Sequence, residues 1–420
     1  MSALPSAAAP RSRLVVVGNG MAAARTLEEL LSIAPERYAI TVLGAEPHAN
    51  YNRILLTPLL AGEMGRAEIM LNDREWYASR GVALHLGCRA AAIDRARREV
   101  VAEDGRRFGY ERLLLATGSQ PAALPVPGCD LPGVLTYRDL GDTEAMIAAA
   151  RPGGSAVVIG GGLLGIEAAN GLTARGMRVT LVHLPPTLME RQLDETAGAM
   201  LGEALATRGI VVETAARTEA FVAGPDGRLA AVRLEDGRSL PATLAVTAVG
   251  IRPNGALAQA AGLPCQRGVV VSDTMQTNDP RIYAVGECVA HRGVTYGLVS
   301  PVYAMARVCA NHLAGAGFAS YRGSVPSARL KVSGIHMFSA GDIRAGDGDE
   351  EMTLMDAGAG VYRKLVLRDG RLAGAVLYGD VDGAADYEDL MARRAPVADL
   401  RERLLFAGLW RRNGEEAATA

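Results

Sequence analysis

The stretch LVVVGNGMAAARTLEELL, residues 14–31, has the pattern of a buried strand, a tight glycine turn and a helix. Gly18 allows a sharp turn out of the strand, Gly20 lets the backbone come close to a pyrophosphate, and the small Ala24 lets the helix pack closely on the sheet. Phosphates would then lie at the helix N-terminus, where free backbone N–H groups and the helix dipole favour negative charge. Most glycine-rich turns bind nothing, so the turn alone is weak evidence for a dinucleotide site.

The residues that follow the helix strengthen this interpretation. Residues 38–43, YAITVL, have the composition of a second strand, and Glu46 comes just after it. A carboxylate at that place can accept hydrogen bonds from the ribose hydroxyls of adenosine. Strand, turn, helix, strand and acid therefore occur in the order that predicts a dinucleotide-binding unit.

The same pattern returns in residues 156–172, AVVIGGGLLGIEAANGL. Gly160, Gly162 and Gly165 complete a G-x-G-x-x-G spacing on a strand, turn and helix, and residues 178–182 form the next predicted strand. Two such units in one chain are much stronger evidence than one, because chance matches would have to occur twice in the correct context. The sequence predicts a protein that binds two dinucleotides.

The second unit departs from the usual pattern at the end of its second strand. His183 stands where an acid would bind the ribose of NAD and repel the 2′-phosphate of NADP. Arg191 could reach a 2′-phosphate, although such an arginine more often lies exposed on a helix. The choice between NADH and NADPH therefore stays open, with NADH favoured.

The remaining segments indicate how the two units are joined. A buried strand is expected at residues 113–121, and residues 244–254 close the inserted unit. Another strand at 279–289 ends at Gly286 and Glu287 before a helical pattern at 302–313. Residues 97–110 and 229–240 alternate apolar and polar residues around Asp-Gly turns, which predicts two hairpins. Residues 51–63 are too irregular for a strand and suit a loop with a short helix. From about residue 326 the pattern changes to hairpins and a final helix.

Together these patterns predict an α/β protein with two Rossmann-like dinucleotide-binding domains and a small α+β C-terminal domain. We expect a first dinucleotide-binding domain at residues 1–120 and 250–322, a second one inserted at 121–249, and the C-terminal domain at 323–420. At 420 residues, a chain of two to three domains is expected, each large enough to bury its own core.

Composition excludes several classes of protein. The chain is 49% hydrophobic and 21% charged with a formal net charge of −2, so nothing indicates a basic face for nucleic acid. The five cysteines are scattered, which argues against a dithiol, an iron–sulfur cluster or a zinc site, and we expect no metal. No run is long and apolar enough to span a bilayer, so a cytoplasmic location is expected. Residues 1–13 suit a disordered tail better than a transit peptide.

Several motifs taken together resemble a known family. The order GNGMAAA, LLLATGSQP, VVIGGGLLGIEAA, TAVGIRPN and IYAVGECVAHRG is similar to the FAD/NAD(P)H two-dinucleotide oxidoreductases, which include ferredoxin and rubredoxin reductases. The segments YNRILLTPLLAGE, LVHLPPTLMERQLD and SARLKVSGIHMFSAGD resemble, more narrowly, the flavoprotein portion of NAD(P)H-dependent nitrite reductase large subunits and the electron-transfer subunit of assimilatory nitrate reductase. The similarity extends from about residue 13 to 395.

The resemblance implies that residues 1–120 and 250–322 are an FAD-binding domain and that residues 121–249 are an NAD(P)H-binding domain. It thus implies FAD and NADH or NADPH as cofactors, together with a set of site residues. Arg53 and Glu167 are the expected catalytic residues. Cofactor binding is expected at Gly18, Gly20, Met21, Ala22, Ala24, Glu46, Arg53, Ala116, Thr117, Gly118, Gly160, Gly162, Leu163, Leu164, Gly165, Glu167, His183, Arg191, Gly250, Gly286 and Glu287. The ferredoxin-reductase class usually pairs a lysine with a glutamate like Glu167. Here Thr57 and Pro58 take the place of that lysine, and Arg53 is the candidate to serve instead.

The expected function is electron transfer from NAD(P)H through FAD to a separate redox partner. Full-length nitrite reductases continue into iron–sulfur and siroheme domains, and this sequence has no such ligands. The partner would therefore have an iron–sulfur cluster, a rubredoxin centre, or a siroheme or molybdenum centre. The alternatives are a rubredoxin- or ferredoxin-type reductase of another pathway and a flavin-binding sensor without turnover. The C-terminal domain would dock the partner, seal the flavin cleft or mediate a homodimer.

Overall fold

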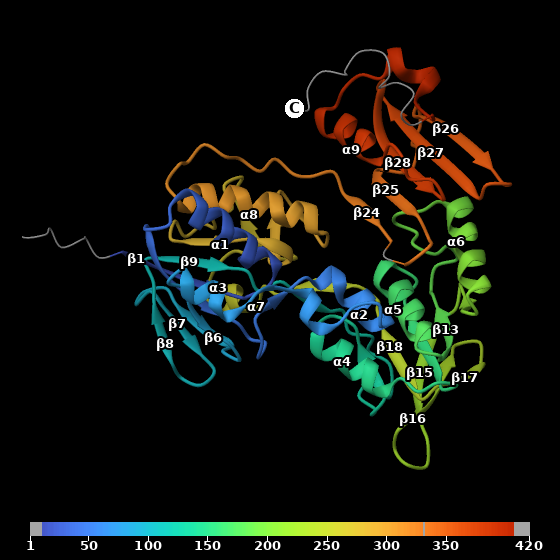
Figure 1. The fold of residues 1–420 in the computed structure, drawn as a ribbon, viewed down its shortest axis with the longest axis horizontal. Helices are drawn as coiled ribbons and strands as arrows, with labels where there is room; N and C mark the ends of the chain where they lie inside the picture. The colour runs from blue at the N-terminus through green and yellow to red at the C-terminus, as the bar shows by residue number, and fades with distance from the viewer. Residues whose placement is uncertain (1–10, 331, 407–420) are drawn as a thin grey trace, which may run out of the picture. The chain divides into compact units, whose positions relative to one another are not determined.

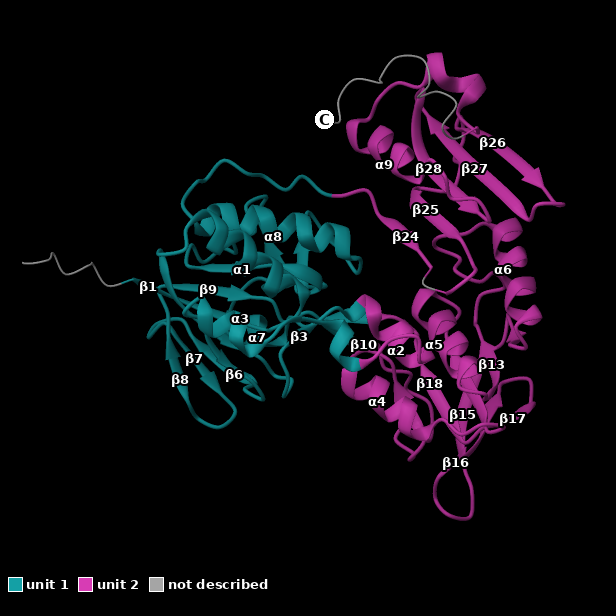
Figure 2. Ribbon diagram, viewed as in Figure 1, with its two compact units in different colours: residues 1–53, 66–120, 251–323 teal, residues 54–65, 121–250, 324–420 magenta. Residues whose placement is uncertain are grey.

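The computed structural model describes residues 11–330 and 332–406, which form two compact units (Figures 1 and 2). The first contains residues 11–53, 66–120 and 251–323, and the second contains residues 54–65, 121–250, 324–330 and 332–406. The predicted α/β class is confirmed. The division into three domains stays a prediction, because the C-terminal sheet belongs to the second unit, as does the short segment 54–65.

A parallel five-stranded sheet is the centre of the first unit. Its strand order is β21-β9-β1-β2-β5, with β1 (Ser12–Val17) in the middle. Strands with both faces buried have continuous apolar sequences, and Leu14, Val15 and Val16 are almost fully buried. The other strands are β2 (Tyr38–Leu43), β5 (Ala83–His85), β9 (Arg112–Leu115) and β21 (Ile282–Ala284). The helices α1 (Met21–Ile33) and α8 (Val299–Leu313) pack side by side on this sheet (Figure 1).

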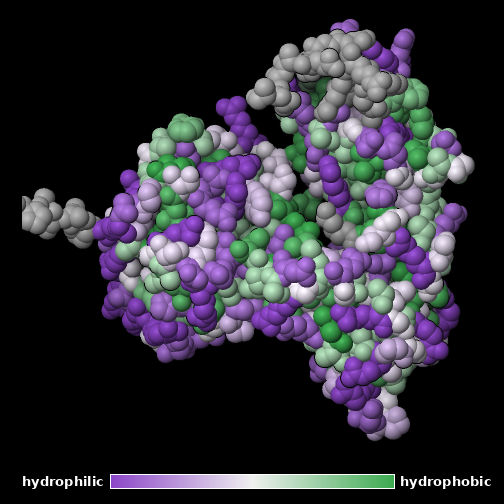
Figure 3. All heavy atoms as spheres, viewed as in Figure 1, coloured by the Kyte–Doolittle hydropathy of each residue, from purple (hydrophilic) through white to green (hydrophobic). Residues whose placement is uncertain are grey.

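A small antiparallel sheet extends this unit. It consists of β6 (Ala90–Asp94), β7 (Glu99–Ala102) and β8 (Arg107–Gly109), and its β7–β8 turn contains the Asp104-Gly105 pair that predicted a hairpin. Val100 is buried in the core, whereas hydrophilic side chains gather over the outer side of this sheet (Figure 3). One face is thus packed and the other solvated, as is usual for antiparallel sheets.

The rest of the first unit is made of short elements. These are β3 (Asn50–Tyr51), η1 (Arg53–Leu55, which runs into the second unit), η2 (Arg66–Ile69), β4 (Met70–Asn72), α3 (Arg74–Ser79), β10 (Ser119–Pro121), β19 (Ile251–Pro253), α7 (Ala256–Ala260), β20 (Val269–Val271), η3 (Gly286–Cys288), β22 (Val289–His291) and β23 (Val294–Thr295).

A second parallel five-stranded sheet organises the second unit, in the order β11-β18-β12-β13-β14. These strands are β11 (Val134–Thr136), β12 (Ser155–Ile159), β13 (Arg178–Val182), β14 (Val211–Glu213) and β18 (Leu244–Thr247), and the helices are α2 (Leu56–Ala61), α4 (Leu140–Ala149), α5 (Leu163–Ala174) and α6 (Glu195–Thr207). The predicted second hairpin forms from β16 (Leu229–Leu234) and β17 (Ser239–Pro241), beside β15 (Thr218–Ala223). Residues 51–63 contain a short helix, as expected.

The C-terminal part of the second unit is an antiparallel sheet in the order β24-β25-β28-β27-β26. Helix α9 (Ala384–Arg393) packs on it, and Tyr387 and Leu390 of the helix join its core. The strands are β24 (Ser327–Arg329), β25 (Met337–Gly341), β26 (Glu350–Asp356), β27 (Val361–Arg368) and β28 (Arg371–Tyr378), and η4 (Ala398–Arg403) follows α9. Within the described ranges, no helix has the length and hydrophobicity needed to cross a membrane.

Candidate cofactor sites

The glycines of the first turn have two different physical roles. Gly18 has φ +107°, and a Cβ atom there would lie 2.2 Å from the Ala116 carbonyl oxygen, so only glycine fits. A Cβ atom on Gly20 would have no neighbour within 4 Å. Gly20 precedes α1, and no side chain caps that helix. Gly20 therefore has open space beside it at a helix N-terminus whose backbone N–H groups are not capped by a side chain. A pyrophosphate needs this arrangement to bind.

The second unit repeats this geometry. Gly160 has φ +118°, and a Cβ atom there would lie 2.3 Å from the Ala248 carbonyl oxygen. Gly162 precedes α5, again without a side-chain cap, and its Cβ position has no neighbour within 4 Å. A Cβ atom on Gly165 would lie 1.7 Å from the Gly160 carbonyl oxygen. The residues fit a second dinucleotide in the same way as the first.

Glu46, expected to bind the FAD ribose, lies in a polar cluster of the first unit. It accepts hydrogen bonds from the Tyr51 hydroxyl at 2.9 Å and from Arg53 Nη2 at 2.5 Å. One third of the Glu46 side chain is exposed, so its remaining lone pairs can accept further hydrogen bonds. Arg53 forms an ion pair with Glu46, and the idea that Arg53 serves in place of a lysine beside Glu167 stays a prediction.

The loop after β9, which contains the predicted residues Thr117 and Gly118, is fixed by a residue that the sequence did not single out. Asn254 donates from Nδ2 to the Thr117 carbonyl oxygen at 2.9 Å, and the Thr117 hydroxyl donates to the Asn254 carbonyl oxygen at 2.8 Å. The Asn254 backbone N–H also donates to the Gly118 carbonyl oxygen at 2.9 Å. The Asn254 side chain therefore adds one donor, Nδ2, to the two backbone hydrogen bonds that join this residue to the loop.

Gly286 and Glu287 lie beside this loop in the first unit. Gly286 has φ +88°, and a Cβ atom there would lie 2.8 Å from the Ala22 side chain, so the start of α1 passes close to it. The Ser119 hydroxyl donates a hydrogen bond to Glu287 Oε2 at 2.7 Å. The structure therefore brings Ala22, Gly286 and Glu287 together at the carboxyl ends of β1 and β21, where ligands of such sheets bind.

Glu167 lies on α5 and is almost fully buried. Its Oε2 accepts a hydrogen bond from the Thr57 hydroxyl of α2 at 2.7 Å, and the Tyr137 hydroxyl donates to Thr57 Oγ1 at 3.4 Å. Burial raises the pKa of Tyr137, so its hydroxyl stays a donor. Thr57 thus gives Glu167 a neutral hydrogen-bond donor. Sequence reasoning missed Tyr137.

His183 is buried beneath the second glycine turn. Its Nδ1 accepts a hydrogen bond from the Gly161 backbone N–H at 2.9 Å, and Nε2 lies 3.2 Å from Glu190 Oε2. Arg191 is exposed. Gly250, which closes the inserted segment with φ +114°, accepts a hydrogen bond from the Ala122 backbone N–H at 2.9 Å. Glu190 is a carboxylate that the sequence analysis did not consider for this site.

The described residues contain neither a disulfide bond nor a group of side chains that could hold a metal ion. All five cysteines are free thiols. Burial raises the pKa of Cys288 and of Cys309, which keeps both thiols protonated. In the part of the chain that the structure describes, no three His, Cys, Asp or Glu side chains are grouped to hold a metal ion.

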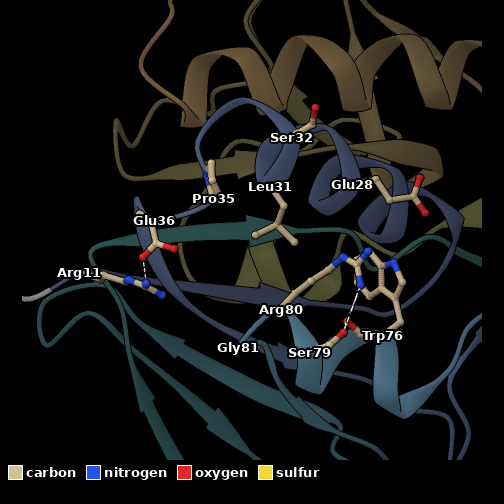
Figure 4. A pocket seen from close by; sticks show the side chains of 10 residues that line it. All are labelled: Arg11, Glu28, Leu31, Ser32, Pro35, Glu36, Trp76, Ser79, Arg80 and Gly81. Atoms are coloured by element: carbon tan, nitrogen blue, oxygen red, sulfur yellow. Dashed lines mark hydrogen bonds and ion pairs between the residues drawn. The ribbon is translucent and has the colours of Figure 1, made fainter.

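A pocket of about 680 Å³ opens on the first unit at the end of α1 that is remote from the Gly20 turn (Figure 4). Leu31 and Ser32 of α1 line it together with Trp76 and Arg80, and the Arg80 guanidinium lies over the Trp76 ring. Because the phosphate cradle is at the other end of the helix, this pocket is separate from the expected dinucleotide site.

Comparison with known proteins agrees with this geometry. The family model for pyridine nucleotide-disulphide oxidoreductases matches residues 12–310. The chain belongs to this family. It is therefore an NAD(P)H-dependent oxidoreductase, which confirms the resemblance inferred from the motifs. A second model, the C-terminal domain of rubredoxin NAD⁺ reductase, matches residues 326–395.

Two curated relatives of this oxidoreductase come from Bacillus subtilis. Nitrite reductase [NAD(P)H] is 45% identical over 93% of this chain and 48% of its own length. The assimilatory nitrate reductase electron transfer subunit is 39% identical over 94% of this chain and 51% of its own length. The chain thus spans about half the length of these relatives.

Among solved structures, the covalent putidaredoxin reductase–putidaredoxin complex matches the fold of this oxidoreductase with a TM-score of 0.85. The match has 26% identity and covers 92% of this chain and 94% of the other. This similarity supports the fold class, in which a chain has two Rossmann-like sheets and an antiparallel C-terminal sheet.

Proposed function

We propose that this oxidoreductase binds FAD in the first unit and NAD(P)H in the second, and passes electrons to a separate redox protein. The observation that carries the proposal is the repeated glycine geometry. In each unit one glycine is required by a close backbone contact, and another, Gly20 or Gly162, leaves open space at an uncapped helix N-terminus. A single dinucleotide would need only one such cradle.

The roles of the residues follow from their chemistry. Flavin supplies hydride and one-electron chemistry when bound. The N–H groups that begin α1 and α5 would hold the two pyrophosphates, and Glu46 would accept hydrogen bonds from the FAD ribose. Thr57 holds the Glu167 carboxylate in one orientation through its 2.7 Å hydrogen bond. The described residues contain no dithiol and no metal cluster, and the proposed acceptor is a redox centre outside them.

We consider two kinds of redox protein as the electron acceptor. The two Bacillus relatives are named for nitrite and nitrate reduction, and this supports a siroheme- or molybdenum-containing reductase as the acceptor. The second candidate is a small iron–sulfur protein or rubredoxin. It is favoured by the match of residues 326–395 to the rubredoxin reductase domain and by the likeness to putidaredoxin reductase.

The test begins with the purified protein under anaerobic conditions. We expect a flavin absorption spectrum with one FAD per chain, bleaching of that spectrum by a stoichiometric amount of NADH or NADPH, and reduction of ferricyanide in the steady state. Rubredoxin, a [2Fe–2S] ferredoxin and a siroheme nitrite reductase module are then compared as acceptors. A protein that takes up no FAD, or whose FAD is not bleached by either nucleotide, would contradict the proposal.

A further inference from the structure

We propose that Glu190 binds the adenosine ribose of the nicotinamide cofactor and makes the second unit selective for NADH over NADPH. The inference rests on the proposed function, because it assigns a role at the second dinucleotide site. It differs from the expectation drawn from the sequence, where the end of β13 had His183 and no acid.

The hydrogen bonds of His183 define which of its ring nitrogens has the proton. Its Nδ1 accepts a hydrogen bond from the Gly161 N–H at 2.9 Å, so that nitrogen has no proton. A neutral imidazole with an unprotonated Nδ1 has its proton on Nε2. Nε2–H therefore donates to Glu190 Oε2 at 3.2 Å. Because the imidazole is neutral in this arrangement, the pair retains the negative charge of Glu190.

The loop that contains Glu190 is attached to the glycine turn by a hydrogen bond and by side-chain packing. The Met189 backbone N–H donates to the Gly161 carbonyl oxygen at 2.9 Å. Leu188 is buried against Gly161, where a Cβ atom would lie 2.7 Å from the Leu188 side chain. Met189 has φ +52°, a left-handed conformation that a methionine rarely adopts. This turn returns the chain so that Glu190 meets His183.

Glu190 differs from the neighbouring acid at this edge of the sheet in that its carboxylate is accessible to a ligand. Glu213 ends the neighbouring strand β14, but it is paired with Arg238 at 2.7 Å. Glu190 is about one third exposed, so its carboxylate is accessible to a ligand while His183 orients it. Arg344 Nη2 donates to the Glu190 backbone oxygen at 3.1 Å, which fixes the main chain without neutralising the side chain.

These contacts place a fixed carboxylate beside the end of β13, where Rossmann units bind the adenosine ribose. A carboxylate can accept hydrogen bonds from both ribose hydroxyls, whereas it repels the 2′-phosphate of NADPH. His183 acts as a positioning residue: it supports the glycine turn through Nδ1 and directs Glu190 through Nε2. Arg191, the residue considered for a 2′-phosphate, would then have no role in selectivity.

The experiment measures binding to the FAD-loaded protein by isothermal titration calorimetry. ADP-ribose and 2′-phospho-ADP-ribose are the probes, because they occupy the adenosine half of the site without hydride transfer. The wild-type protein is expected to bind ADP-ribose at least tenfold more tightly. Glu190→Gln should weaken ADP-ribose binding about tenfold and remove most of the discrimination, because a charge-assisted hydrogen bond and a repulsive charge are both lost. Glu203→Gln, an exposed residue of α6, is the matched control and should bind both probes like wild type.

Three outcomes would overturn the inference: tighter wild-type binding of 2′-phospho-ADP-ribose, wild-type discrimination in Glu190→Gln, or loss of 2′-phospho-ADP-ribose binding in Arg191→Ala. His183→Asn tests positioning, since its amide oxygen can still accept from Gly161 but the side chain is too short to direct Glu190. It should lose discrimination as Glu190→Gln does, and retained discrimination would refute the positioning role. Failure of the wild-type protein to bind either probe would instead contradict the proposed second dinucleotide site.

Discussion

The Thr57 hydroxyl lies 2.7 Å from Glu167 Oε2 and donates a hydrogen bond to this buried carboxylate, although the two residues are 110 positions apart. The contact depends on the packing of α2 on α5, which is close because Gly171 faces Leu60. A Cβ atom on Gly171 would lie 2.7 Å from Leu60 Cγ. Arg175 Nη2 also donates to the Leu59 carbonyl oxygen at 3.1 Å, which satisfies the end of α2. A six-residue helix is thus fixed where its one hydroxyl meets Glu167.

Removing this hydroxyl should destabilise the second unit. Thr57→Val keeps the shape of the side chain and deletes the donor. Hydrogen bonds to charged groups contribute about 1.5–3 kcal/mol, so the thermal midpoint should fall by several degrees. Differential scanning calorimetry measures the change. Thr173→Val on α5 is the control, because it deletes only a hydroxyl bond to the Ala169 carbonyl oxygen and should have little effect. Equal midpoints for the two variants would contradict the prediction.

The glycines of the second turn should separate binding from folding. Gly162→Val places a side chain in space that the protein leaves open, so it should fold and keep FAD but lose reduction by NAD(P)H. Gly165→Ala places a methyl group 1.7 Å from the Gly160 carbonyl oxygen and should reduce the yield of folded protein. The measurements are flavin content, circular dichroism and anaerobic bleaching by NADH. Loss of FAD in Gly162→Val, or unchanged hydride transfer, would count against two separate sites.

Local patterns explain why so much of the fold was predicted from the sequence. The two glycine turns and the two Asp-Gly hairpins depend on a few neighbouring residues, and the structure has them at the expected places. The contacts of Glu167 and of Asn254 depend on segments more than 100 residues apart, and spacing could not reveal them. The hydrogen bond between His183 and Glu190 depends on the left-handed conformation of Met189. The sequence of that loop does not predict this conformation, because methionine rarely adopts it.

The acid stability of the first unit should depend on Asp273. Hydrogen bonds from Arg292 and His291 lower the pKa of Asp273 from 3.8 to about 2. A carboxyl with a lower pKa in the folded state stabilises the fold above the unfolded pKa, and this contribution is lost as the pH falls from about 4 to 2. Asp273→Asn should therefore have a lower thermal midpoint than wild type at pH 6, with the difference narrowing toward pH 2.

Thermal scans between pH 2 and 7 check this dependence. Asp130→Asn, at an exposed residue, is the control and should leave the profile unchanged. A difference between Asp273→Asn and wild type that stays constant across the range would show that the ionised form of Asp273 is not what stabilises the fold.

Asp194 should link the C-terminal sheet to α6. Its Oδ1 caps α6 by accepting from the Ala197 N–H at 3.1 Å, and its Oδ2 accepts from the Tyr362 hydroxyl of β27 at 2.6 Å. Asp194→Ala loses both bonds and also the ion pair of Oδ2 with Lys364 of β27 at 3.7 Å. Asp139→Ala loses the equivalent cap of α4, in which Asp139 Oδ1 accepts from the Asp142 N–H at 2.9 Å. The cap contributes about 1 kcal/mol to the free energy of unfolding in each case. Any further decrease of that free energy in Asp194→Ala therefore measures how strongly Asp194 attaches the sheet to α6. Chemical denaturation should show the larger loss for Asp194→Ala and a smaller one for Tyr362→Phe, since Tyr362→Phe leaves the cap intact. If Asp194→Ala and Asp139→Ala lower the free energy of unfolding equally, the contacts of Asp194 with Tyr362 and Lys364 of β27 do not stabilise the sheet on α6.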